Sequence, residues 1–247
     1  MNTNVSTALI TGGTSGIGRA VANQLATLDI QVIVAGRNEE KGKQTVNNIH
    51  ELGGEAHFVQ VDLEDISSAS ILAKQAIEIS NGNIDILINN AAIYPAGLTH
   101  NIEQKDFERV YTLNVKTPYF LVAELAPLMA KKGQGAIVNV SSIAAEYGIP
   151  GVSLYGSSKA AINYLTKVWT AEYGPSGVRV NTVSPGPTYT EGTELVSEGI
   201  VKMASQSPAR KPASAEEIAS AISFLATESS SFVYGAKLIV DGGVTAI

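Results

Sequence analysis

The chain of 247 residues is 45% hydrophobic and 16% charged, so it can bury the core of one large domain. Its net charge of −6, from 17 basic and 23 acidic residues, argues against an extended nucleic-acid-binding surface. The absence of cysteine excludes disulfides, thiolate metal ligands and cysteine nucleophiles, and the three histidines form no metal-binding motif, so we expect no metal.

Short apolar runs alternate with helical patterns along the chain. Several runs are apolar almost throughout, as is typical of parallel strands covered on both faces. The runs are residues 7–11, 31–35, 56–61, 84–89, 135–140, 178–183 and 237–240. We therefore predict one α/β domain over residues 1–247, a doubly wound, Rossmann-like parallel sheet of about seven strands with helices on both faces. Ligands of such sheets bind at the carboxyl ends of the strands.

A glycine-rich turn follows the first predicted strand. Gly12, Gly13, Gly16 and Gly18 lie between the apolar run 7–11 and a helical pattern. Glycine lets a chain turn tightly and lets backbone N–H groups approach a phosphate at the N-terminus of a helix. The turn therefore predicts nucleotide binding, although a methyltransferase or a purely structural turn would also fit. It contains no Gly-Lys-Ser/Thr sequence, which argues against a P-loop.

The second predicted strand ends at Ala35-Gly36-Arg37-Asn38. Folds that bind an unphosphorylated ribose place an acidic residue here, which binds the 2′-hydroxyl. A guanidinium group instead forms charge-assisted hydrogen bonds with a 2′-phosphate. Arg37 therefore favours NADP(H) over NAD(H), the alternative being that its side chain lies in solvent.

The most apolar run is residues 119–130, which contain Glu124 and Pro127 and are too short to span a bilayer. A helix here would be apolar nearly all round, so we expect it to be buried on more than one side, by its own domain or by a partner subunit. No basic region precedes an apolar stretch at the start of the sequence. These features predict a cytoplasmic protein that does not enter membranes.

Tyr155 is followed at i+4 by Lys159, a combination that no other tyrosine of the chain has. If residues 155–173 are helical, the two side chains lie on one face, about one turn apart. At about 4 Å and an effective dielectric of about 20, an attraction of about 4 kcal/mol would lower the phenol pKa by about three units. Such a tyrosine is a general acid or base near neutral pH. Simple packing on a helix face is the ordinary alternative.

Residues 184–214 interrupt the alternation of strands and helices. A connection of that length in a compact domain is usually functional, and we predict a substrate lid at about residues 187–213.

Several motifs, taken in order, resemble the short-chain dehydrogenase/reductase family, of the small single-domain kind, over nearly the whole chain. They are Thr11-Gly-x-x-x-Gly16-x-Gly18, Asp62, Asn89-Asn90-Ala91-Ala92, Asn114, Ser142, Tyr155-x-x-x-Lys159 and Pro185-Gly186. The resemblance implies a catalytic tetrad of Asn114, Ser142, Tyr155 and Lys159. It also implies a homotetramer, in which the 119–130 helix and the helix starting near Tyr155 pack against their counterparts.

The catalytic roles are consistent with carbonyl reduction, in which negative charge develops on the substrate oxygen as hydride arrives. We expect Ser142 to polarise that oxygen and Tyr155 to protonate it. By resemblance, Lys159 lowers the phenol pKa and holds the nicotinamide ribose, and Asn114 binds a water that links Lys159 to solvent.

The cofactor is expected to be NADP(H). By resemblance, Asp62 contacts the adenine, Asn90 lies along the cofactor and Thr190 binds the nicotinamide carboxamide. The full set of expected cofactor contacts is Gly12, Thr14, Ser15, Gly16, Ile17, Gly18, Arg37, Asn38, Asp62, Leu63, Asn90, Ala91, Tyr155, Lys159, Pro185, Gly186, Thr188 and Thr190.

The leading hypothesis is an NADPH-dependent reductase of ketones or aldehydes, reversible as a secondary-alcohol dehydrogenase. The alternatives are a 3-ketoacyl-thioester reductase acting on acyl carrier protein, a non-catalytic dinucleotide-binding sensor, and a sugar-nucleotide epimerase. Epimerases usually carry a larger C-terminal substrate domain than the few residues after Gly243. Glu146 would bind a substrate hydroxyl or amine, or else only solvent. The candidate pocket residues are Ile93, Tyr94, Pro95, Ala144, Glu146, Tyr147, Pro187, Leu195, Val196 and Met203.

Overall fold

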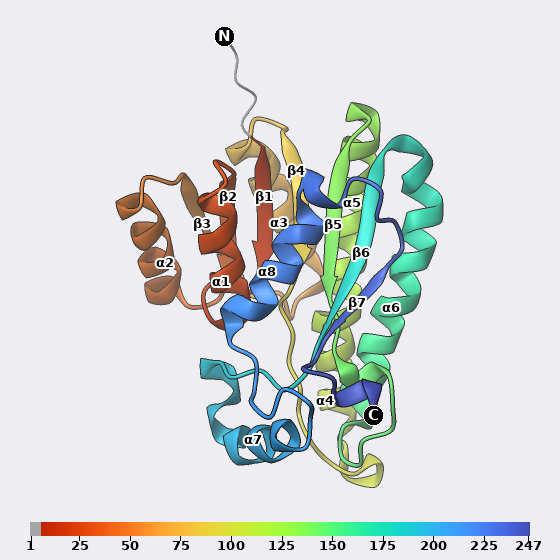
Figure 1. Cartoon of the computed structure of the whole chain (residues 1–247). Coiled ribbons are helices and arrows are strands. Elements are labelled where there is room, and N and C mark those ends of the chain that lie inside the picture. Colours follow the sequence, from red (N-terminus) through yellow and green to blue (C-terminus); the bar gives the residue numbers. More distant parts are fainter. Residues whose placement is uncertain (1–5) are drawn as a thin grey trace.

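The computed structural model describes residues 6–247, with only the backbone described for Ile66, Leu195 and Val196. In this part of the chain, seven parallel strands form one sheet in the order β3-β2-β1-β4-β5-β6-β7 (Figure 1). They are β1 (Thr7–Thr11), β2 (Gln31–Gly36), β3 (Ala56–Gln60), β4 (Ile84–Asn89), β5 (Gly135–Val140), β6 (Val178–Pro185) and β7 (Lys237–Val240). The predicted fold class, a doubly wound parallel sheet of about seven strands, is therefore confirmed.

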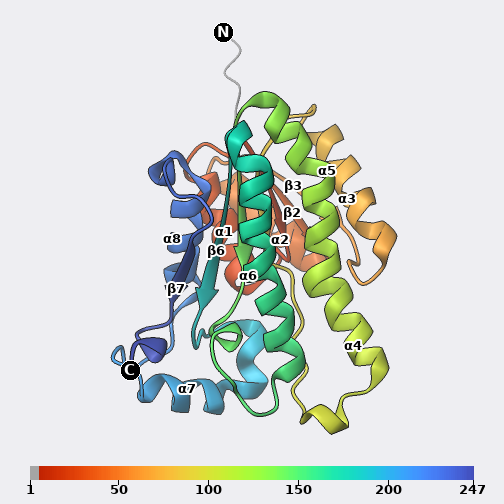
Figure 2. The same ribbon diagram turned by 90° about the vertical axis from the view of Figure 1, so that its right-hand side faces the viewer.

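Helices cover both faces of the sheet (Figures 1 and 2). One face carries α1 (Gly16–Ala26), α2 (Glu39–Glu51) and α8 (Ala215–Ala226). The other carries α3 (Ile66–Ile79), α5 (Thr117–Lys132) and α6 (Ser153–Tyr173). Two further helices, α4 (Gln104–Tyr111) and α7 (Ser197–Ser205), lie toward the carboxyl ends of the strands (Figure 1).

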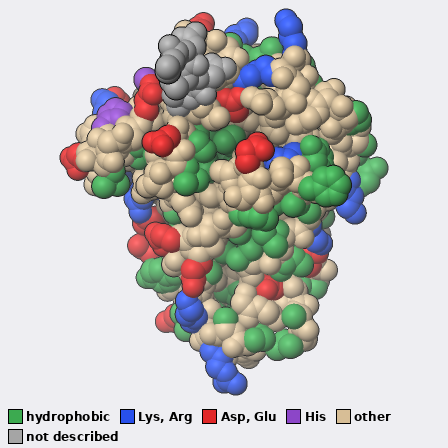
Figure 3. All heavy atoms as spheres, turned by 45° about the horizontal axis from the view of Figure 1, so that its top comes forward, with side chains coloured by type: hydrophobic (Ala, Val, Ile, Leu, Met, Phe, Trp, Pro, Cys, Tyr) green, Lys and Arg blue, Asp and Glu red, His purple; other side chains and the backbone are tan. Residues whose placement is uncertain are grey.

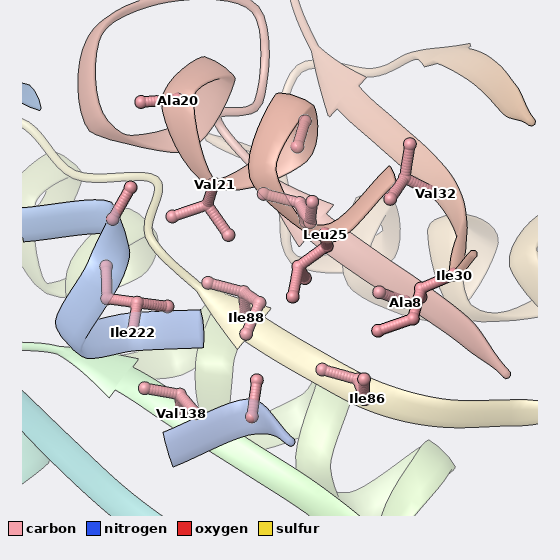
Figure 4. Close-up of a cluster of buried hydrophobic side chains, with 14 of the residues drawn as sticks. Ala8, Ala20, Val21, Leu25, Ile30, Val32, Ile86, Ile88, Val138 and Ile222 are labelled. Carbon is pink, nitrogen blue, oxygen red and sulfur yellow. The ribbon is translucent and has the colours of Figure 1, made fainter. Parts of the chain in front are cut away.

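The apolar cores between sheet and helices explain the strand pattern. On one face, Val21 and Leu25 of α1 and Ile222 of α8 pack with Ile86 and Ile88 of β4 (Figure 4). Each of these side chains is at most 5% exposed, and such burial contributes about 1.5–3 kcal/mol per side chain. Because the opposite face is covered in the same way, the central strands are apolar at nearly every position.

The strand order reverses next to β1, which pairs with β2 on one side and with β4 on the other. The chain runs outward through β2 and β3, returns to β4, and continues outward through β5, β6 and β7. A crevice for ligands is expected at this reversal, beyond the carboxyl ends of β1 and β4. The glycine-rich turn lies directly after β1.

A buried polar chain fixes α6 to the sheet. Asn89 of β4 donates to Asn139 of β5 over 2.8 Å, and Asn139 donates to the Thr166 hydroxyl of α6 over 2.8 Å. The Thr166 hydroxyl lies 2.7 Å from that of Thr182 in β6. Hydrogen bonds of this kind offset the cost of burying polar groups. They fix the position of the helix that carries Tyr155 and Lys159.

The apolar 119–130 run lies within α5 and is only partly buried, because Tyr119 is 47% exposed and Phe120 is 40% exposed. Hydrophobic side chains also gather on the face seen in Figure 3. Exposed hydrophobic residues on α8, on β7 and between them include Phe224, Phe232, Tyr234 and Ile239. Among the helices of residues 6–247, none has both the length and the apolar composition needed to cross a membrane.

Candidate active site

The glycine-rich turn forms a close cradle at the reversal of strand order. Gly12 and Gly16 have φ angles of +63° and +50°, which favour glycine. A Cβ on Gly18 would lie 2.2 Å from the Gly12 carbonyl oxygen, so no larger residue fits there. Asn90, just after β4, donates through Nδ2 to the carbonyl oxygens of Thr11 and Gly12 over 2.9 and 3.1 Å. The predicted residues Gly12, Gly16, Gly18 and Asn90 are thus brought together.

The segment after β6 lies across this turn. Pro185 ends β6, and the Gly186 N–H donates to the Val240 carbonyl oxygen over 2.9 Å. Thr188 is buried and donates to the Gly186 carbonyl oxygen. The side chain of Thr190 reaches the turn, since a Cβ on Gly16 would lie 3.2 Å from its Cβ atom.

One contact in this region was not anticipated from the sequence. Glu191 accepts a hydrogen bond from the Gly16 N–H over 2.9 Å, although the two residues are 175 positions apart. Its carboxylate also pairs with Arg19 of α1. A glutamate after a predicted threonine ligand carries no local pattern that would have identified it.

The second predicted strand end carries an ion cluster. Arg37 binds Glu64 over 2.9 Å, and Arg109 binds the same carboxylate through two hydrogen bonds of 2.7 and 2.8 Å. The hydrogen bond from Arg109 is the main cause that holds the pKa of Glu64 below its usual value. The Arg37 side chain stays 56% exposed, but its guanidinium is engaged rather than free in solvent. Sequence reasoning missed Glu64 and Arg109.

The other residues expected near the adenosine also have local contacts. Asn38 is the N-cap of α2 and accepts from the Lys41 N–H over 2.8 Å. Asp62 is exposed and accepts from the Glu64 N–H over 3.1 Å, whereas Leu63 is buried. Thr14 is buried in the glycine-rich turn, while Ser15, the N-cap of α1, makes no side-chain capping bond. Ile17 and Ala91 are half-buried beside the turn.

Ser142 and Tyr155 meet beyond the carboxyl end of β5. Ser142 follows β5 and caps a short 3₁₀ turn, Ile143–Ala145, while Tyr155 lies in the first turn of α6. Burial raises the pKa of Tyr155 to about 12, and a hydrogen bond with the Ser142 side chain opposes this rise. The phenol is therefore protonated at neutral pH.

The Lys159 ammonium lies over the face of the Tyr155 ring. Its Nζ is 5.7 Å from the ring centroid and donates to the Val140 carbonyl oxygen over 2.7 Å. Burial lowers the pKa of Lys159 to about 8. The prediction that Lys159 lowers the phenol pKa is wrong for this structure, because burial acts on both groups and the ammonium is bound to the backbone.

Tyr94, a predicted pocket residue after β4, packs against the Tyr155 ring. The centroids are 5.9 Å apart and the rings cross at 67°. The Tyr94 hydroxyl donates to the Gly192 carbonyl oxygen, and burial raises the pKa of the Tyr94 phenol. The residue therefore joins the Tyr155 ring to the segment that contacts the glycine-rich turn.

Asn114 is buried in a π-helical turn, Thr112–Lys116, between α4 and α5. Such turns are frequently found at functional sites. Its Nδ2 donates to the Ile93 carbonyl oxygen and to the Ser158 hydroxyl over 2.9 and 3.1 Å, and its Oδ1 accepts from the Ile93 N–H over 3.0 Å. The side chain thus joins the loop after β4 to α6, and its contact with a water stays a prediction.

Glu146 is not the solvated carboxylate that was one of its two expected environments, and its contact with a substrate stays a prediction. It pairs with Lys237 of β7 and accepts from Asn163 over 3.2 Å, and its side chain is only 16% exposed. It therefore is not a solvated carboxylate, and its hydrogen-bond partners lie on α6 and β7.

Some of the other pocket candidates line a cavity of about 490 Å³. Tyr147 and Met203 form part of its wall, together with Lys202 and Gln206 of the α7 region and Val244 and Ile247 of the C-terminal turn. The side chains of Leu195 and Val196 lie outside the described part of the structure.

Comparisons with known proteins agree with this arrangement. A family model described as enoyl-(acyl carrier protein) reductase matches residues 12–245. An uncharacterized oxidoreductase of Thermotoga maritima is 39% identical and is aligned over 100% of both chains.

Two solved structures are also similar. A protein described as a short chain dehydrogenase/reductase family protein has a TM-score of 0.89 and 45% identity, covering 98% of this chain and 97% of its own. A candidate NAD(P)-dependent gluconate 5-dehydrogenase from Beutenbergia cavernae, with bound NADP at low occupancy, has a TM-score of 0.93 and 31% identity, covering 98% of this chain and 97% of its own.

Proposed function

The chain belongs to the short-chain dehydrogenase/reductase family of oxidoreductases, and we propose that it reduces a ketone or aldehyde with NADPH and oxidises the corresponding secondary alcohol in reverse. The observation that carries this proposal is the meeting of the Ser142 and Tyr155 hydroxyls beyond the carboxyl end of β5. Lys159 lies directly beneath the Tyr155 ring.

The glycine-rich turn supports a bound dinucleotide. Gly12, Gly16 and Gly18 let the turn pack closely against Asn90 and Thr190, and the N-terminus of α1 behind it favours an anion. When bound, the nicotinamide supplies hydride to the carbonyl carbon. Thr190, which reaches the turn, would bind the carboxamide, and Asn90 would lie along the cofactor while bracing the turn.

The two hydroxyls would act on the substrate oxygen. Ser142 would donate a hydrogen bond where negative charge develops, and Tyr155 would transfer its proton to the same oxygen. A Tyr155 pKa of about 12 keeps the phenol protonated, as a general acid for reduction needs. In the oxidative direction the phenolate would be the base, so that direction should be favoured at higher pH.

Lys159 and Asn114 would support this proton transfer. With a pKa of about 8, Lys159 is cationic at neutral pH, and its ammonium would hold the nicotinamide ribose hydroxyls beside the Tyr155 ring. Asn114 would position α6 and the loop after β4 through the bonds of its side chain. It would also bind the water that links Lys159 to solvent.

Preference for NADP(H) over NAD(H) is supported by Arg37 at the end of β2. Its side chain is more than half exposed, and the guanidinium could turn toward a 2′-phosphate, for which it would leave Glu64. Arg109 would then keep the Glu64 carboxylate paired. The similar structure from Beutenbergia cavernae contains NADP, which agrees with this choice.

The substrate would be a medium-sized ketone or aldehyde. Of the predicted pocket residues, Tyr147 and Met203 line the cavity of about 490 Å³ and Tyr94 packs on Tyr155, and aromatic or apolar residues of this kind suit such substrates. A 3-ketoacyl thioester is the second candidate, because the matching family model is named after reductases of acyl carrier protein substrates.

A variant pair tests the proposal. Tyr155→Phe should lower the turnover of ketones about 10²- to 10⁴-fold while NADPH still binds, because only the transferable proton is lost. Tyr164→Phe is the matched control, since Tyr164 lies on the same helix and is 69% exposed. NADPH consumption at 340 nm would be followed with ketones, aldehydes and a 3-ketoacyl thioester. Undiminished turnover by Tyr155→Phe would refute the reductase, and wild-type turnover of the thioester alone would favour the second candidate.

Self-association as a homotetramer is the remaining part of the proposal. Exposed aromatic side chains on α5 and α6, namely Tyr119, Phe120 and Tyr164, support contacts of these helices with their counterparts. Light scattering should give the mass of four chains at micromolar concentration. A monomer under these conditions would contradict the proposal.

A further inference from the structure

Glu191 places a carboxylate at the start of α1. One oxygen accepts from the Gly16 N–H over 2.9 Å, and the other accepts from Arg19 over 2.5 Å. The neighbouring Thr190 side chain lies against Gly16 as well. The 3₁₀ turn that Glu191 begins, Glu191–Val196, is thereby held across the glycine-rich turn.

This carboxylate is placed where an anionic ligand is expected. The N-terminus of a helix has unpaired N–H groups and a partial positive charge. In dinucleotide-binding folds, the diphosphate of the cofactor lies at the N-terminus of the helix that follows the first strand. Ser15, the N-cap of α1, makes no side-chain capping bond, and the Gly16 N–H is bound by Glu191.

The electrostatics agree with an anion in this place. Burial by itself would raise the pKa of Glu191. The hydrogen bond from Gly16 and the ion pair with Arg19 outweigh this effect, so the pKa lies below its usual value. Glu191 is therefore ionised at neutral pH. A diphosphate at the same N–H group would meet a negative charge and could bind only if the carboxylate moved away.

We propose that Glu191 is an internal competitor for the cofactor diphosphate, holding the 3₁₀ turn Glu191–Val196 against the glycine-rich turn until a dinucleotide displaces the carboxylate. The inference rests on the proposed function, since it concerns the cofactor of the same site. Arg19, released from Glu191, then faces the diphosphate as a free cation.

Displacement of Glu191 would also change contacts next to Tyr155, where the substrate is expected to bind. The next residue, Gly192, accepts the hydrogen bond of the Tyr94 hydroxyl, and the Tyr94 ring packs on Tyr155. A segment that leaves Gly16 therefore also changes the hydrogen bond of an aromatic residue beside the reacting phenol. Cofactor binding would in this way open the substrate side and favour binding of cofactor before substrate.

The test compares Glu191→Gln with Glu194→Gln in dissociation constants measured by calorimetry without substrate. Glutamine keeps the shape of Glu191 but removes its charge, and Glu194 is an exposed glutamate of the same turn. Glu191→Gln should bind NADPH about three- to tenfold more tightly, because a helix-terminal contact and an exposed ion pair are each worth a few-fold in an equilibrium. Glu194→Gln should bind as the wild type does.

Ligands without a diphosphate make the test specific. ADP should gain affinity for Glu191→Gln as NADPH does, whereas adenosine should bind both proteins equally. Equal or weaker binding of NADPH by Glu191→Gln, or an equal gain for adenosine, would overturn the inference. Failure of the proposed reductase would show differently, as NADPH binding without turnover of any carbonyl compound by the wild type.

Discussion

Replacing Lys159 with methionine should remove a pH dependence of stability that the wild-type protein has. Lys159 is 3% exposed, and burial lowers its pKa from 10.5 to about 8. At about 1.4 kcal/mol for each pH unit, this difference corresponds to about 3 kcal/mol of folding free energy. Methionine has a similar shape and no charge, so the variant lacks this contribution at every pH.

The sign follows from the two protonation states. Below pH 8, Lys159 is charged in the folded and unfolded chain, and the folded state bears the full cost of burying the ammonium. Between pH 8 and 10.5, the unfolded chain holds a proton that the folded protein has released, so wild-type stability rises with pH. The stability of Lys159→Met relative to wild type should therefore fall by about 2.5 kcal/mol between about pH 7 and 10.

Urea unfolding without cofactor, followed by the fluorescence of the buried Trp169 at one protein concentration, measures this difference. Tyr155 is present in both proteins, so its own titration cancels. Lys167→Met is the matched control, because Lys167 lies on the same helix and is exposed. The reasoning is refuted if the free-energy difference between wild type and Lys159→Met is the same at both pH values. A confirmed difference would mean that the protein keeps an ammonium at a cost in stability, as expected of a functional group.

Two further predictions concern the cofactor site. Glu64→Gln should raise the preference for NADPH over NADH in kcat/KM about three- to tenfold, because Glu64 holds Arg37 at 2.9 Å. Arg37→Asp should reverse this preference. Equal preferences in the wild type and both variants would argue against Arg37 as the 2′-phosphate ligand. Gly18→Ala should weaken NADPH binding at least about tenfold and lower the free energy of unfolding by about 1–3 kcal/mol, because its Cβ would lie 2.2 Å from the Gly12 carbonyl oxygen. Gly199→Ala, where a Cβ meets nothing within 4 Å, is its control, and a wild-type dissociation constant and melting temperature for Gly18→Ala would show that the cradle is not as tight as described.

The fold could be predicted because its signals are local. The apolar run 7–11 corresponds to β1, and the runs 84–89 and 135–140 coincide with β4 and β5. A strand buried on both faces must be apolar at nearly every position, so a short run of consecutive apolar residues is enough to identify it. The i+4 spacing of Tyr155 and Lys159 likewise placed both on α6, since a helix repeats every 3.6 residues.

The pKa of Tyr155 could not be predicted from spacing. Sequence reasoning considered only the attraction between phenol and ammonium, whereas burial raises the pKa of the phenol and the hydrogen bond with Ser142 only partly offsets this rise. The cost of burial depends on how completely neighbouring elements cover a group. The contacting residues Ser142 and Tyr94 come from the segments after β5 and β4, which are far apart in the sequence, so the pKa shift depends on how these segments pack.

By itself, the sequence determined the parallel sheet, the glycine-rich turn, the Tyr155-Lys159 pair and the order of the family motifs, because each is a pattern within one element or one turn. Only the tertiary structure decided which groups bind these residues. Glu64 binds Arg37, the Val140 carbonyl oxygen accepts from Lys159, and Glu191 accepts from the Gly16 N–H. Glu191 and Gly16 are 175 residues apart, and no periodicity or spacing connects positions so distant. Such contacts arise where the carboxyl ends of parallel strands bring separate loops to one edge of the sheet.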